Sequence, residues 1–187
     1  MWPQVIRVIR KRTVEGISIV ATVHSMSGAL LWSIYGINAA VPSITLANIV
    51  TFVAVGFVIG AQVRYGAVSL RLAIGSQLTI AFIGIGAAYI SESFIGVVAI
   101  AIGGTAIVPQ TIRSARTDRQ VGVSALTFAM IAVMSVSWAI YGAVLGNAFI
   151  IAPNFLVVPC AIFISIRAMI SHRRYDNTSE AVAVPAR

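Results

Sequence analysis

Two tryptophans and two asparagines occupy matching positions in an otherwise apolar chain. Trp32 precedes Asn48 by 16 residues, and Trp138 precedes Asn154 by the same 16 residues. Each pair is centred on a short turn without Lys or Arg, so that each of the four residues lies 8 positions from the middle of its turn. At about 1.5 Å per helical residue, this places all four about 12 Å deep in an apolar layer about 30 Å thick. At that depth an Asn can hydrogen-bond hydroxyl groups, and a Trp can stack on an apolar ring face. The spacing therefore predicts a substrate-binding ring of four residues.

The same four residues also have a purely structural interpretation. An Asn in a spanning helix can tie two helices together, which contributes about 0.6 to 2 kcal/mol, and a Trp can simply fill space between helices. Depth alone does not separate a pore lining from such helix ties.

The elements that must position these residues are membrane-spanning helices. Of the 187 residues, 59% are hydrophobic and 10% are charged, and the mean hydropathy is +0.96. Soluble domains carry about 25% charged residues, so a soluble fold is excluded. A spanning helix needs about 20 mostly apolar residues. Five complete stretches of this kind are present, and a shorter sixth completes the set: roughly 14–37, 42–63, 68–90, 120–142 and 147–169, with the sixth at 93–113. The predicted fold class is an all-α integral membrane protein.

The charged residues predict the orientation of these spans. The formal net charge of +8 comes from Arg and Lys in alternate loops, whereas the turns near 38–42, 90–93 and 143–147 contain neither. This alternation follows the positive-inside rule and predicts a multi-pass protein of the cell membrane with a cytoplasmic C-terminus. The basic residues do not form a stripe on a soluble surface, so nucleic acid is not an expected partner. The excess of Arg over Lys indicates a GC-rich genome, and hence a bacterial cytoplasmic membrane.

The chain contains two copies of one unit. Residues 3–57 and 109–163 share fourteen identities at a constant offset of 106 without a gap, and these include the scarce residue types Pro, Gln, Trp and Asn. Each unit consists of a helix ending in Pro-Gln, a basic loop with Gly-x-Ser, a helix ending in Trp-x-x-Tyr-Gly, and a helix carrying the Asn. Both basic loops must face the same side, so one extra span must lie between the units. This predicts a three plus one plus three arrangement: repeat 1 at 1–64, a linker helix at 68–90, repeat 2 at 93–170 and a disordered cytoplasmic tail at 171–187.

Most of the first helix of repeat 1 is missing. Pro3 has two residues before it, whereas Pro109 follows an apolar helix of about the expected length. We expect that the start codon has been assigned too late and that the upstream DNA encodes the rest of this helix in frame. A fragmentary sequence or a genuine stub would also explain the difference.

The two Pro-Gln dipeptides, the basic loops, Gly-x-Ser and Trp-x-x-Tyr-Gly together resemble the PQ-loop superfamily over nearly the whole chain. The Trp and the Asn in both halves are most similar to SWEETs and to the half-size SemiSWEETs. The resemblance implies two three-helix bundles around a central pore, alternating access and, in many members, sugar uniport. The superfamily also contains exporters of cystine and cationic amino acids, so the fold does not fix the substrate.

The resemblance also implies a hinge at the inner gate of the pore. Pro3 and Pro109 each remove a backbone donor inside an apolar helix and create a kink beside Gln4 and Gln110. In the family this kink is the hinge of the inner gate. A static kink is the alternative interpretation.

Three further side chains have a predicted place in the pore. Tyr35 and Tyr141 lie one turn beyond the tryptophans, where the resemblance implies an extracellular gate, although an interfacial anchor explains them equally well. His24 lies near the middle of its span and is a candidate proton site, with a neutral imidazole bonded to a neighbouring helix as the more common alternative. Every acidic residue before the C-terminal tail lies at a helix end or in a loop, so we predict transport without proton coupling.

No enzyme, cofactor or metal site is predicted. The sequence shows no nucleophile and base constellation, no Gly-rich phosphate loop and no Cys/His metal spacing, and its single cysteine, Cys160, lies inside a span. We therefore predict a transporter that moves a small polar solute, most simply a sugar, across a lipid bilayer by uncoupled alternating access. The sequence is also compatible with a homo-oligomer. The alternatives are a proton-coupled amino-acid or cystine-type exporter of the same fold, and a membrane scaffold or receptor that moves no solute.

Overall fold

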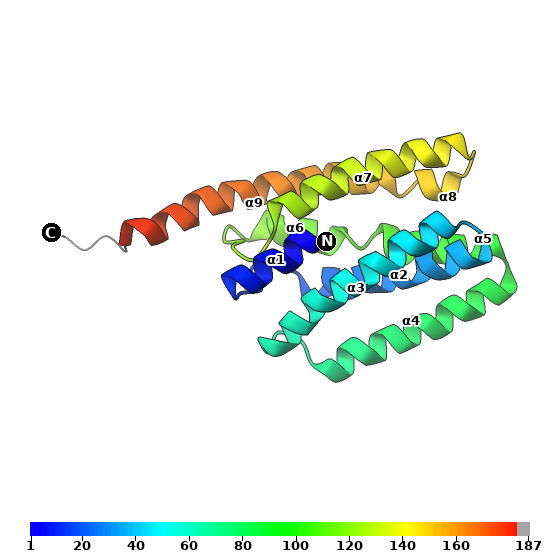
Figure 1. Cartoon of the computed structure of the whole chain (residues 1–187), viewed down its shortest axis with the longest axis horizontal. Helices are drawn as coiled ribbons and strands as arrows, with labels where there is room; N and C mark the ends of the chain where they lie inside the picture. The colour runs from blue at the N-terminus through cyan, green and yellow to red at the C-terminus, as the bar shows by residue number, and fades with distance from the viewer. Residues whose placement is uncertain (183–187) are drawn as a thin grey trace.

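The structure is a computed structural model that describes the backbone of residues 1–182 and the side chains of residues 1–175. Over these residues the secondary structure is entirely helical (Figure 1). The helices are α1 (Trp2–Lys11), α2 (Ile19–Asn38), α3 (Pro42–Arg64), α4 (Leu70–Ile90), α5 (Glu92–Ala99), the π-helix η1 (Ile100–Gly104), α6 (Val108–Arg116), α7 (Ala125–Val144), α8 (Ala148–Ile151) and α9 (Asn154–Val182).

Five helical stretches are long and apolar enough to cross a membrane, which confirms a multi-pass membrane protein. They are Pro42–Arg64, Leu70–Ile90, Glu92–Arg116, Ala125–Val144 and Ala148–Tyr175. The remaining predicted span corresponds to α2, which is 20 residues long but falls outside this set. Its hydropathy is lowered by Thr22, by His24 and by three serines along its length.

The helices pack as two groups with α4 at one edge (Figure 1). In one group α7 lies along α9, and in the other α2 lies along α3, while α4 packs against α2 and α5. The short helices connect the groups, because α1 packs on both α3 and α7, and α6 packs on both α9 and α2. The N-terminal arm of each repeat therefore touches the other repeat.

The loops that join the long helices lie at two ends of this bundle (Figure 1). The loops after α1, α3 and α6 carry, together with the helix ends that flank them, most of the arginines, and we call this side the basic end. The turns after α2, α4 and α7 lie at the opposite end. Serine caps begin four of the helices, each accepting a hydrogen bond from a backbone N–H in the first turn: Ser18, Ser69, Ser91 and Ser124. Two of these caps are the serines of the Gly-x-Ser motifs.

Two helices of the second repeat are interrupted. α5 continues into η1 and then into a turn at 105–107 before α6 begins at Val108. Pro109 stands in the first turn of α6 and has no N–H to donate, so a regular α-helix does not run through this point. The span predicted at 147–169 is likewise divided, because Pro153 separates α8 from α9.

The predicted disordered tail at 171–187 is wrong for residues 171–182, which continue α9 to Val182. This stretch contains no Pro or Gly that would end a helix. Contacts also hold its first turn, since Ser171 Oγ accepts a hydrogen bond from Gln120 N at 2.8 Å and His172 Nε2 lies 3.0 Å from Val123 O. The rest of the predicted tail, 183–187, lies outside the described residues.

Three apolar clusters form the core of the described residues, a small one around Val55 and Ile59 and two larger ones toward the two ends of the bundle. The cluster toward the basic end joins α1, α3, α7 and α9 and includes Val8, Val58 and Ile164. The cluster toward the opposite end includes Tyr35 and Ile150, with Trp32 and Trp138 packed against its margin. The candidate site lies beside this second cluster.

Candidate functional site

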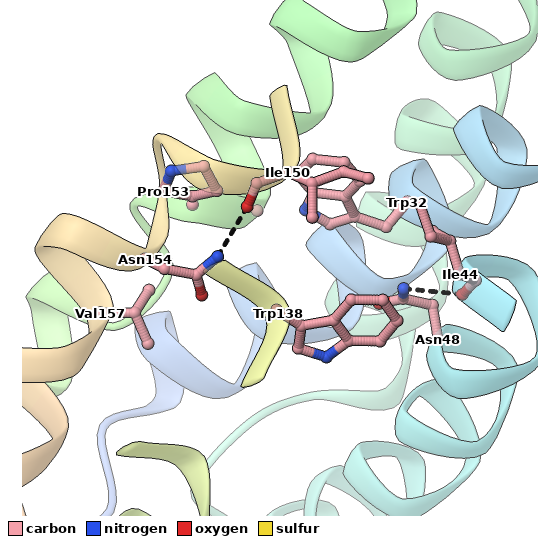
Figure 2. Close-up of a pocket in the computed structure, with 10 residues that line it drawn as sticks. Trp32, Ile44, Asn48, Trp138, Ile150, Pro153, Asn154 and Val157 are labelled. Carbon is pink, nitrogen blue, oxygen red and sulfur yellow. Dashed lines mark hydrogen bonds between the residues drawn. The ribbon is translucent and has the colours of Figure 1, made fainter. Parts of the chain in front are cut away.

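The four residues of the predicted ring line one cavity of about 160 Å³ (Figure 2). Trp32 comes from α2, Asn48 from α3, Trp138 from α7 and Asn154 from the start of α9. The complete lining consists of Trp32, Ile44, Asn48, Gly103, Gly104, Trp138, Ile150, Pro153, Asn154 and Val157. The structure therefore brings together side chains that are more than 100 positions apart in the sequence.

Six of these lining residues form three equivalent pairs of the internal repeat. The isoleucines 44 and 150, the two asparagines and the two tryptophans are each related by the offset of 106. The glycines and Pro153 come from the second repeat only. The sequence analysis did not place Gly103 and Gly104 in the site, although both line the cavity. Two adjacent glycines shortly before Pro109 were the signal in the sequence that could have indicated a close backbone approach here.

Each asparagine hydrogen-bonds the backbone four residues before it, Asn48 within α3 and Asn154 across the break between α9 and α8. Asn48 Nδ2 donates to Ile44 O at 2.9 Å, and Asn154 Nδ2 donates to Ile150 O at 2.6 Å (Figure 2). Both are local bonds to the carbonyl one turn earlier. The Asn48 bond stays inside α3, whereas the Asn154 bond links α9 to the short helix α8 that precedes it. Among the described residues, none donates to either amide oxygen, so both Oδ1 atoms remain available as acceptors.

Each tryptophan is held by the tyrosine one turn further along its helix. The rings of Trp32 and Tyr35 meet edge to face, with centroids 5.4 Å apart and planes at 88°. Trp138 and Tyr141 repeat this arrangement at 5.6 Å and 76°. Such aromatic pairs contribute about 0.5 to 1.5 kcal/mol beyond the buried area and fix the orientation of the indole rings.

Glycines allow the backbone of η1 to approach the indole of Trp32. A Cβ on Gly103 would lie 2.7 Å from Trp32 Nε1 and 3.1 Å from Gly28 Cα. A Cβ on Gly104 would lie 2.9 Å from Pro153 Cβ. Larger residues would therefore fill the cavity or push η1 away from α2.

The two tyrosines also contact the opposite repeat. Tyr35 is fully buried, and its hydroxyl accepts a hydrogen bond from Asn147 Nδ2 at 2.9 Å. Tyr141 Oη lies 3.2 Å from Ser43 Oγ. Tyr35 thus meets the residue that caps α8 in repeat 2, and Tyr141 meets the first turn of α3 in repeat 1. A gate at this end remains a prediction.

A second cavity, of about 740 Å³, adjoins the first. It shares both tryptophans and Asn48, and its lining extends from Ser43 toward the opposite end to Gln110 toward the basic end. The two cavities together extend along the bundle beside the predicted ring.

The predicted hinge residues stand at the start of matching helices. Pro3 and Pro109 lie in the first turns of α1 and α6, and Gln4 and Gln110 are buried. Both glutamine side chains bond to backbone atoms of the other repeat and not to the cavity ring. A hinge at the prolines stays a prediction.

The cavity around the ring carries no formal charge. Among the described residues, those that line it include no Asp, Glu, Lys, Arg or His. His24 is half-buried in α2 and lines neither of the two cavities described above. No group of three or more His, Cys, Asp or Glu in the described part of the chain could hold a metal ion.

Comparison with known proteins identifies the first repeat. Residues 3–65 match the model of a family described as "Sugar efflux transporter for intercellular exchange". A sugar transporter SemiSWEET of Escherichia coli (strain UMEA 3162-1) is 43% identical over 49 residues, which cover 26% of this chain and 55% of that relative. The chain thus matches about half the length of this curated relative. No solved structure matches the chain significantly. These matches confirm the predicted resemblance of residues 3–65 to the SWEET and SemiSWEET sugar transporters.

Proposed function

We propose that this protein is a membrane transporter that moves a small polar solute, a sugar in the first place, by uncoupled alternating access. The cavity that gathers Trp32, Asn48, Trp138 and Asn154 is the observation that carries this proposal. The match of residues 3–65 to a sugar efflux family supports the substrate class.

The chemistry of the cavity suits a neutral, hydroxylated ring. The two Oδ1 atoms of Asn48 and Asn154 accept hydrogen bonds from hydroxyl groups, and the indole faces stack on the apolar side of a sugar ring. The volume of about 160 Å³ lies below the roughly 300 to 1,000 Å³ of pockets for drug-sized ligands, which favours one small solute at a time.

The chemistry of the cavity argues against an amino acid as the solute, and so against the amino-acid exporter. An amino acid carries an ammonium and a carboxylate group, and each needs a charged or strongly polar partner when it leaves water. The lining residues provide no charged side chain. Proton coupling would need a titratable group beside the cavity. Neither cavity has a carboxylate in its lining, and His24 is not a lining residue of either.

For the architecture we propose the three plus one plus three arrangement. Repeat 1 (1–64) and repeat 2 (93–170) then tilt against each other about the ring, while the linker helix (68–90) joins them at the edge. Tyr35 and Tyr141 serve as the gate at the opposite end. The basic end faces the cytoplasm of a bacterial cell, in agreement with the distribution of arginines.

Solute flux in proteoliposomes tests this proposal. Purified protein is reconstituted, and uptake of radiolabelled monosaccharides, disaccharides, neutral amino acids and cystine is measured with empty liposomes as the control. We expect equilibrating flux of one or more monosaccharides and background flux of amino acids. Flux of amino acids alone would favour the exporter, and sugar binding without any flux would favour a receptor.

A further inference from the structure

An apolar groove of about 500 Å³ runs between α1 and α3 of repeat 1. It shares no lining residue with the two cavities beside the ring. The groove opens to the outside of the bundle, because the lining residues Ile9, Val53 and Phe57 are exposed. Its lining residues on α3 recur every three or four positions and so share one face of the helix: Val53, Gly56, Phe57, Gly60, Ala61 and Arg64.

Two glycines of α3 keep this groove hollow. Among the described residues, a Cβ on Gly60 would meet no atom within 4 Å, and a Cβ on Gly56 would meet only Met26, at 3.8 Å. The equivalent positions of repeat 2, at the offset of 106, carry Ile162 and Ile166. Repeat 2 therefore places two large side chains on the helix face that repeat 1 leaves open.

Arg64 stands where the groove meets the basic end. It is the last residue of α3, its side chain is exposed, and the equivalent residue of repeat 2 is Ile170. In the described part of the chain no acidic side chain pairs with Arg64, because Glu15 pairs with Arg119 and Asp118 pairs with Arg167. The Arg64 guanidinium is therefore available to a negatively charged ligand.

The surroundings of Arg64 favour a ligand with a net negative charge. Arg10 and Arg12, at the end of α1, are exposed at the same end of the bundle. Arg7 and Lys11 are engaged within the chain, Arg7 through a hydrogen bond from Nε to Val121 O at 2.7 Å, so they do not enter this argument. Positive charge around a phosphate site attracts an anionic headgroup and repels the ammonium of a zwitterionic one.

The length of the groove matches one leaflet of the bilayer. Arg64 and Val53 are 11 positions apart along α3. At about 1.5 Å per helical residue, the groove is about 16 Å long. One leaflet supplies about half of a hydrocarbon core that is about 30 Å thick, and a helix of another chain would cross the whole core. The occupant that fits this length is one acyl chain with its headgroup at Arg64.

We propose that the groove between α1 and α3 binds one anionic phospholipid of the leaflet at the basic end, with an acyl chain against Gly56 and Gly60 and its phosphate on Arg64. The planar guanidinium donates two parallel N–H bonds to phosphate oxygens. Lipid chains are as apolar as the groove, so the preference over bulk lipid comes from the headgroup. One arginine near the membrane surface favours an anionic lipid about fivefold. This site goes beyond the proposed transport function.

The fluorescence of Trp2 reports on the groove. Its ring contacts that of Phe57, with centroids 5.9 Å apart. Trp32→Phe with Trp138→Phe leaves Trp2 as the sole tryptophan. This variant is reconstituted in phosphatidylcholine vesicles with increasing fractions of chain-brominated phosphatidylglycerol or chain-brominated phosphatidylcholine. Half-maximal quenching should need about fivefold less of the brominated phosphatidylglycerol. Equal quenching by the two lipids would overturn the site.

Substitutions separate the site from a general attraction of anionic lipid. Arg64→Gln should abolish the preference for phosphatidylglycerol, whereas Arg71→Gln, at an exposed arginine of the same end outside the lining, should preserve it. Gly60→Ile introduces the residue of repeat 2 and should also abolish the preference, while the smaller Gly60→Ala should retain most of it. An equal loss in both arginine variants, or a preference that survives Gly60→Ile, would refute the proposal.

Native mass spectrometry of the wild-type protein covers the case in which the tryptophan variants do not fold. With phosphatidylglycerol and phosphatidylcholine added in equal amounts to the detergent-solubilised protein, one phosphatidylglycerol per chain should stay bound, in about fivefold excess over phosphatidylcholine. Dimers without bound lipid would show that a second copy fills the groove, which contradicts a lipid there. Neither measurement uses a solute. Absent flux therefore leaves the lipid site standing, and equal binding of the two lipids leaves the transport function standing.

Discussion

Replacing either asparagine of the ring by alanine is the sharpest test of the site. Asn48 donates to Ile44 O inside α3 at 2.9 Å, and Asn154 donates to Ile150 O in the preceding helix α8 at 2.6 Å. Alanine at position 48 removes a bond inside one helix, and alanine is the best helix former. We therefore expect a change in the free energy of unfolding of less than about 1 kcal/mol for Asn48→Ala.

The effect on the solute should be much larger. Each Oδ1 that bonds a solute hydroxyl contributes about 0.5 to 1.5 kcal/mol, which corresponds to up to about tenfold in affinity. Asn48→Ala and Asn154→Ala should each raise the half-saturation concentration for the transported sugar by about this factor. If both oxygens bind one solute, the double variant should lose close to the product of the two factors.

Proteoliposome flux and a thermal melting curve in detergent are measured together for each variant. Asn38→Ala is the matched control, because Asn38 lies at the end of α2, far from the cavity lining, and bonds Ala88 O at 3.4 Å. A large loss of thermal stability with normal flux per folded molecule would show that the ring asparagines hold the fold. That result would refute the reasoning for this site.

Three further predictions concern the cavity, the predicted gate at Tyr35 and the candidate proton site His24. Gly103→Ala should reduce flux at least tenfold, because its Cβ would lie 2.7 Å from Trp32 Nε1, and a fully active variant with an unchanged melting curve would contradict the close approach. Tyr35→Phe removes the bond to Asn147 and should speed labelling of a cavity cysteine from the opposite end about tenfold, as measured with an impermeant maleimide; an unchanged rate would argue for a simple interfacial anchor. His24→Gln should leave the flux ratio with and without a protonophore near one, as in the wild type, whereas concentrative uptake abolished by the protonophore would establish proton coupling.

Much of this protein was predictable from its sequence because the relevant signals are local or periodic. The length and apolarity of the stretches determine the spans, and five of them are confirmed as candidate membrane helices. The offset of 106 identifies the duplicated unit. The distance of Trp32 and Asn48 from the same turn, repeated at Trp138 and Asn154, was enough to select four residues that share one cavity.

The exact points at which helices begin and end were harder to predict, because a single residue can interrupt or extend a helix. Pro153 divides the last span, although its equivalent in repeat 1, Ala47, lies inside the continuous helix α3. Residues 171–182 looked like a tail because they are polar, but they extend α9. A polar composition does not by itself end a helix when no Gly or Pro interrupts it and the first turn is held by tertiary contacts.

Only the tertiary structure decided which partners the polar side chains select. The sequence allowed the ring asparagines to tie helices, yet each bonds the carbonyl one turn before it. Gln4 was assigned beside a hinge, yet it bonds Gly122 and Ser124, 118 and 120 positions away in the chain. Spacing along a chain specifies depth and helix face, but a hydrogen bond needs two groups within about 3 Å, and that distance depends on how the repeats pack.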